Sequence, residues 1–142
     1  MKKIMIIALV SLISAGLNAQ NNANYNFSSG YVQYVKYDAE KKSYYVDSEG
    51  NLISKIAIKD SLVTLMTVTD NKPSIVTIAV SDIKKDSLDN NMTFTLCGIN
   101  VKDHKQIKIG FWFIAGELDQ VSYLEEASKQ FIAYRDLKKV EN

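Results

Sequence analysis

The feature of this chain that most constrains its fold is the alternation of apolar side chains with other side chains in short segments. The clearest case is residues 106–114, where Ile107, Ile109, Phe111 and Phe113 occupy every second position. Successive side chains of a β-strand point to opposite faces, so this spacing predicts a strand with one unbroken apolar face. That face must line a dry interior shared with other strands.

Similar segments recur along the chain and are separated by short polar connections. Strands are expected over 31–37, 43–46, 52–59, 62–69, 74–80, 92–96 and 106–114, with a turn at 47–51 and a charged loop at 81–91. Connections this short join antiparallel neighbours, because a parallel crossover needs about a dozen residues or more. The sequence therefore predicts a mainly β fold, a single antiparallel meander of about seven to nine short strands. It would close into a small barrel or fold into a two-sheet sandwich, since both hide the sheet edges.

The C-terminal segment 119–138 is open to two interpretations. It contains many good helix formers and neither Gly nor Pro, so it could be an α-helix. Residues 121–124 and 131–135 also have the composition of two short strands. The many strands that precede this segment favour the second interpretation.

The first nineteen residues have the order of a secretory signal peptide. Lys2 and Lys3 precede an apolar run over 4–13, and small residues follow up to Ala19. The run is shorter than the roughly 20 residues of a membrane span, and no transmembrane segment is expected in the mature chain. We expect cleavage after Ala19, a flexible lead-in over 20–30 and a single β-rich domain over 31–142. The mature protein would lie in the periplasm or outside the cell.

Composition argues against several classes of function. Removal of Lys2 and Lys3 leaves the basic residues, 17 in the full chain, nearly balanced against the 16 acidic ones, so nucleic acid is not an expected partner. Cys97 and His104 are each the sole residue of their type, which argues against an internal disulfide, a zinc site or a Cys–His catalytic pair. Residues 47–51 resemble a calcium loop, but Ile58 stands where that motif needs Glu. No catalytic residue, metal ligand or cofactor is therefore expected, and an enzyme is not favoured.

Aromatic side chains are the remaining candidates for contact with a partner or ligand. Tyr31, Tyr34, Tyr44 and Tyr45 are concentrated in the first two expected strands. Trp112 alternates with Phe111 and Phe113, so it should lie on the opposite face of its strand. Aromatic residues on both faces of a sheet are typical of a core on one side and a recognition surface on the other.

The leader ending Asn18–Ala19–Gln20, followed by a short chain rich in Tyr and Lys, resembles small exported β-rich proteins of Bacteroidota bacteria. The resemblance implies an envelope or secreted location and transfers no functional residue. Our first hypothesis is a non-catalytic exported domain that binds a macromolecular partner at the cell envelope, either a protein or a glycan. The alternatives are a carrier of a small apolar ligand in a calycin-like barrel and a hydrolase that uses dispersed carboxylates. An interior filled by Phe111, Phe113 and aliphatic residues would leave no room for a carried ligand.

Overall fold

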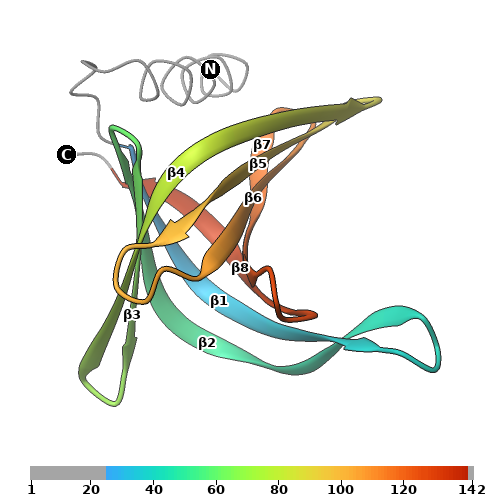
Figure 1. Ribbon diagram of the computed structural model, residues 1–142, viewed down its shortest axis with the longest axis horizontal. Coiled ribbons are helices and arrows are strands. Elements are labelled where there is room, and N and C mark those ends of the chain that lie inside the picture. The colour runs from blue at the N-terminus through green and yellow to red at the C-terminus, as the bar shows by residue number, and fades with distance from the viewer. Residues whose placement is uncertain (1–24, 141–142) are drawn as a thin grey trace.

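The computed structural model describes residues 25–140, in which eight antiparallel strands close into one barrel (Figure 1). The strands are β1 Tyr25–Asp38, β2 Ser43–Lys59, β3 Leu62–Thr69, β4 Lys72–Leu88, β5 Asn91–Asn100, β6 Gln106–Ile114, β7 Glu117–Glu125 and β8 Gln130–Val140. Each strand pairs with the next in sequence, and β8 pairs with β1. The predicted mainly β meander is confirmed, and its closure is a barrel. The predicted signal peptide lies outside the described residues.

The two ends of the barrel differ in which turns they carry. The β1–β2, β3–β4, β5–β6 and β7–β8 turns belong to one end, which we call the hairpin end. Tyr25, Val140 and the remaining three turns belong to the other, which we call the terminal end. In Figure 1 the tip of the β3–β4 hairpin lies at the bottom left of the picture, the tip of the long β1–β2 hairpin at the right, and the β4–β5 tip at the upper right.

The interior is filled toward the terminal end. Phe94 and Phe113 meet edge to face with ring centroids 5.9 Å apart, and Phe111 beside them is fully buried. Of the other large side chains with almost no exposure, Phe27, Ile56 and Val63 lie near this end and Ile107 lies beside the β5–β6 turn; the remaining ones are Ile78, Leu96, Ile109 and Val121. A pocket at this end, beside the β2–β3 turn, measures about 10 Å³, roughly the space of one water molecule. This part of the barrel therefore has no room for a ligand.

The turn predicted at 47–51 is wrong. β2 runs through this segment, because residues 48–51 pair with residues 31–34 of β1. A bulge between Tyr34 and Val35 absorbs the extra residue of β2. The chain turns instead at 39–42. Hydrogen bonds across the hairpin thus outweigh the turn preference of the polar residues.

The loop predicted at 81–91 is also wrong, because β4 extends to Leu88 and pairs with β5 almost to its tip. Only Asp89 and Asn90 remain as the turn. The flexible lead-in predicted over 20–30 is wrong from Tyr25 onward, where β1 begins. In both places a neighbouring strand supplies hydrogen-bond partners that local composition does not reveal.

The C-terminal segment forms the two strands β7 and β8, and the helical alternative over 119–138 is wrong. β8 is held on its other side by β1, which closes the barrel. The β7–β8 ladder is short, covering residues 121–124 and 131–134. Just beyond it, Arg135 Nη1 lies 2.7 Å from Asp119 Oδ2 and joins the two strands by an ion pair. Residues 25–140 contain no helix that is long and apolar enough to cross a membrane.

Candidate functional site

An inner pocket of about 210 Å³ opens inside the barrel at the hairpin end. Its apolar lining consists of Leu52, Leu65, Val76 and Ile132. Its polar lining consists only of hydroxyl groups, from Tyr34, Tyr123, Tyr134, Thr67, Thr69 and Ser74. Among the described residues, no charged side chain lines this pocket. Its chemistry therefore suits an uncharged, largely apolar group that can exchange hydrogen bonds with hydroxyls.

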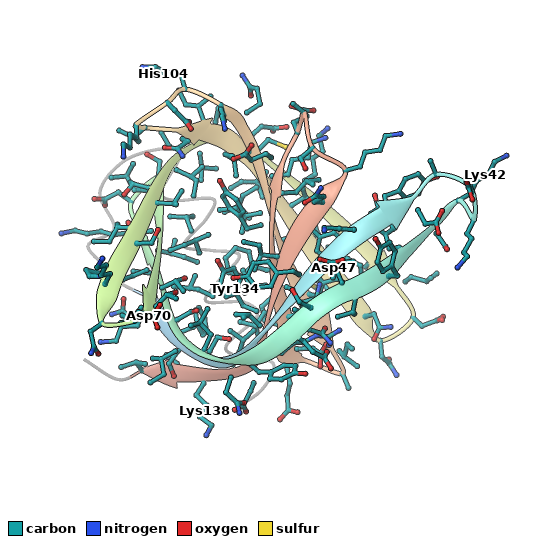
Figure 2. The ribbon with its side chains drawn as sticks, turned by 90° about the horizontal axis from the view of Figure 1, so that it is seen from below. Lys42, Asp47, Asp70, His104, Tyr134 and Lys138 are labelled. Carbon is teal, nitrogen blue, oxygen red and sulfur yellow. The ribbon has the colours of Figure 1, made fainter. Side chains whose placement is uncertain are left out.

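Tyr134 lies deepest among these hydroxyl residues. Its side chain is 5% exposed, and Figure 2, which views the barrel from below, shows it near the centre of the ring of strands. Burial raises the pKa of Tyr134 to about 12, although a hydrogen bond with Thr67 acts in the opposite direction. Thr67 Oγ1 also lies 3.4 Å from Ser54 Oγ. The inner pocket thus contains a buried hydroxyl network that stays uncharged at neutral pH.

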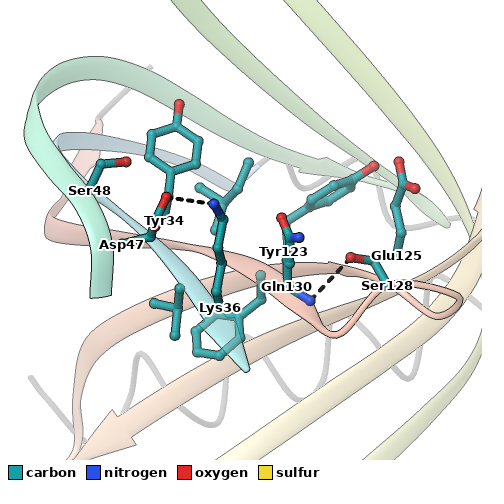
Figure 3. Close-up of a pocket in the computed structure, with 11 residues that line it drawn as sticks. Tyr34, Lys36, Asp47, Ser48, Tyr123, Glu125, Ser128 and Gln130 are labelled. Carbon is teal, nitrogen blue, oxygen red and sulfur yellow. Dashed lines mark hydrogen bonds and ion pairs between the residues drawn. The ribbon is translucent and has the colours of Figure 1, made fainter. Parts of the chain in front are cut away.

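An outer pocket of about 430 Å³ continues from the inner one to the rim of the barrel. The two pockets share Tyr34, Tyr123 and Ile132. Ile132 of β8 pairs with Tyr34 of β1 on one side and with Tyr123 of β7 on the other, so the three form one row across adjacent strands. In Figure 3, Tyr34 and Lys36 stand on one side of the outer pocket, and Tyr123 and Gln130 on the other. The two pockets therefore border each other along this row.

The outer pocket differs from the inner one because it carries charged groups. Lys36 Nζ lies 2.8 Å from Asp47 Oδ2, and this contact raises the pKa of Lys36. Glu125 Oε2 lies 3.3 Å from Lys105 Nζ, which comes from the β5–β6 connection. Burial raises the pKa of Tyr123, and the negative charges of Glu125 and Asp103 raise it further. The polar end of a ligand would meet these groups.

Aromatic contacts on the hairpin keep the rim in place. Tyr44 of β2 packs edge to face against Tyr37 of β1 at 5.1 Å and against Phe131 of β8 at 5.5 Å between ring centroids. Lys129 Nζ lies 5.1 Å from the centre of the Tyr37 ring. The long β1–β2 hairpin is thereby attached to the start of β8. These contacts support the strand segments that carry Lys36 and Asp47.

Of the residues expected to contact a partner, only Tyr34 lines the two pockets. Tyr31 lies on the hairpin beside Glu49. The Glu49 carboxylate accepts a hydrogen bond from Gln33 Nε2 at 2.8 Å and another from the Tyr31 hydroxyl. These hydrogen bonds lower the pKa of Glu49, while partial burial and then Glu49 raise that of Tyr31.

The other three expected contact residues do not line the two pockets. Tyr44 belongs to the aromatic contacts of the hairpin, and Tyr45 is an exposed neighbour. Trp112 is 47% exposed on the outer face of β6, where its indole covers Gly110. The structure therefore does not bring the five residues together.

Sequence reasoning missed Tyr123, Tyr134 and Thr67 as site residues. Tyr123 and Tyr134 lie in the segment whose secondary structure was ambiguous. Thr67 lies in an expected strand, where nothing in the sequence distinguishes it from the other threonines as a site residue. One sequence pattern was available. Gln130, Ile132 and Tyr134 occupy every second position, which would place their side chains on the same face of a strand. That pattern becomes informative only once the segment is known to be a strand.

The structure offers little support for metal or nucleophilic chemistry. Within residues 25–140, no group of three or more His, Cys, Asp or Glu side chains could hold a metal ion. Cys97 lies half-buried on β5 opposite Lys108, whereas His104 is exposed in the β5–β6 turn. Asp47 and Glu125 are each paired with a lysine and partly exposed. They are not the buried, unpaired carboxylates that the hydrolase alternative requires.

No protein-family model matches this chain, and a search of curated proteins finds no match either. Function must therefore be inferred from the shape and chemistry of the two adjacent pockets.

Proposed function

We propose that this protein binds a small amphipathic molecule at the hairpin end of its barrel. The observation that carries the proposal is the contrast between the two ends. The terminal end is filled by phenylalanine and aliphatic side chains, whereas the hairpin end keeps two adjacent pockets of about 210 and 430 Å³. A concave pocket with a mostly apolar lining and a few convergent polar groups is the usual mark of a ligand site.

This proposal modifies the calycin-like alternative. An eight-stranded barrel has an interior just wide enough to be filled by side chains or to hold one small ligand. Here both situations occur at different depths, so the ligand would enter the mouth and stop above the phenylalanines. The proposed location is outside the cytoplasm, as the N-terminal sequence suggests.

The hypothesis of a macromolecular partner stays a prediction. Its candidate residues Tyr31, Tyr44 and Tyr45 lie on β1 and β2, and Trp112 lies on β6. Other strands separate these positions in both directions around the barrel. They do not form one continuous surface, which is why the pocket is the better supported site.

A substitution that fills the inner pocket tests the proposal. Val76→Trp places a large ring where Val76 lines the pocket, while Ile75→Trp places the same ring on the exposed face of the same strand. The probe is N-phenyl-1-naphthylamine, an uncharged amphipathic dye titrated by fluorescence with direct excitation. We expect saturable binding to the wild type and to Ile75→Trp, and binding weakened about tenfold or more by Val76→Trp, a loss of about 1.4 kcal/mol. Equal affinity in both variants, or no saturable binding to the wild type, would contradict the proposal.

A further inference from the structure

The charges that line the outer pocket do not cancel. Lys36 and Asp47 form a neutral pair at 2.8 Å. Glu125 is the remaining charged group of the lining, and its partner Lys105 is not part of the pocket. Lys105 Nζ also lies 3.8 Å from Asp103 Oδ2, so one ammonium group serves two carboxylates. Among the residues that line the outer pocket, carboxylates therefore outnumber ammonium groups by one, and the counter-charge of Glu125 lies outside the lining.

The same carboxylates act on Tyr123. Burial raises the pKa of Tyr123, and the charges of Glu125 and Asp103 raise it further. Tyr34 and Tyr123 also place aromatic rings on either side of the outer pocket (Figure 3). Aromatic faces attract cations, and quaternary ammonium groups are commonly bound by such rings.

An anionic ligand fits these groups poorly. The only cationic side chain of the lining, Lys36, is already occupied by Asp47. A carboxylate or phosphate would have to compete with Asp47 while approaching Glu125. In the inner pocket it would meet no cation at all, and burial of an unpaired charge is costly.

We propose that the ligand of this site is an amphipathic organic cation. Its apolar body enters the inner pocket among Leu52, Val76 and Ile132, and its ammonium group stays in the outer pocket beside Tyr123 and Glu125. The inner pocket has no charged side chain, so the charge remains at the wetter rim. This inference rests on the proposed function and adds the charge of the ligand to it.

Three probes with the same octyl chain test the inference by calorimetry at low salt: octyltrimethylammonium, octanol and octanoate. We expect the cation to bind about fivefold more tightly than the alcohol, in the range of a partly exposed charge contact, and the anion to bind most weakly. Added salt should weaken binding of the cation and leave binding of octanol nearly unchanged. Equal affinity of the cation and the alcohol, or preference for octanoate, overturns the inference but leaves a binding site. Failure of all three probes overturns the proposed function itself.

The neighbouring glutamates provide a matched pair of variants. Glu125→Gln removes the charge in the pocket, while Glu126→Gln removes an exposed charge that pairs with Lys108 at 3.0 Å outside it. We expect Glu125→Gln to abolish most of the preference for octyltrimethylammonium over octanol without changing octanol affinity. Glu126→Gln should keep the preference. A preference that survives Glu125→Gln, or that both variants remove equally, overturns the assignment to Glu125.

Discussion

Phe111→Ala is expected to lower the free energy of unfolding by about 3–5 kcal/mol. Phe111 is fully buried on β6, and its cross-strand neighbours are Phe94 and Val121. Truncation leaves a cavity that these well-packed residues cannot collapse to fill, so the transfer and cavity contributions add. Urea denaturation of the protein, followed by circular dichroism, measures the change.

Trp112→Ala provides the matched control for this prediction. Trp112 is the next residue and is an even larger side chain, but it lies on the outer face and is about half exposed. Its removal should cost about 1 kcal/mol, because little buried area is lost. If both variants lose the same stability, the inner face of β6 is not the filled face of the barrel.

Gly98→Ala is expected to destabilise the protein by about 3 kcal/mol or more, a size that a clash with fixed backbone can produce. A Cβ atom at Gly98 would overlap the carbonyl oxygen of Ala79 and would lie 2.9 Å from Ile78 Cγ2. The oxygen belongs to the backbone of β4, so it can move away only if the strand shifts. The β4–β5 ladder already has an irregularity between Val80 and Asp82, next to this contact. Thermal unfolding together with hydrogen exchange of β4 and β5 measures both the loss and its location.

Gly50→Ala is the control for this second prediction. Nothing lies within 4 Å of a Cβ atom at Gly50, which is part of the β1–β2 hairpin. Alanine should therefore be tolerated there or should stabilise by about 0.5 kcal/mol, since it reduces the entropy of the unfolded chain. Equal destabilisation by both substitutions would show that steric contact with β4 is not the cause.

The fold was predictable from the sequence because one physical rule dominates it. Period-two spacing identified the inward face of β6, and Ile107, Ile109, Phe111 and Phe113 are all buried there. The same rule identified Phe94 and Leu96 on β5. Short connections then implied an antiparallel meander. The ends of strands were not predictable at 47–51 and 81–91, where polar residues continue strands because a partner strand pairs with them.

The site was much less predictable than the fold. Its residues come from strands that meet only when β8 pairs with β1, so Tyr34, Tyr123 and Tyr134 are far apart in sequence. Alternation shows that a side chain faces inward but not how deep it lies or whether the space beside it is filled. Of the aromatic residues singled out in advance, Tyr34 lies in the pockets because it is both inward-facing and near the rim.

The most direct test of ligand binding at the hairpin end is a backbone NMR titration of the protein with N-phenyl-1-naphthylamine. We expect saturable shifts of the Tyr34, Tyr123 and Ile132 amides, which lie where the two pockets meet. The chemical shifts of the Phe94 and Phe113 amides, which lie in the filled end of the barrel, should not change. Shifts centred on Phe94 and Phe113 or on Trp112 at the outer surface, or no shifts at saturating dye, would contradict a binding site at the mouth of this barrel.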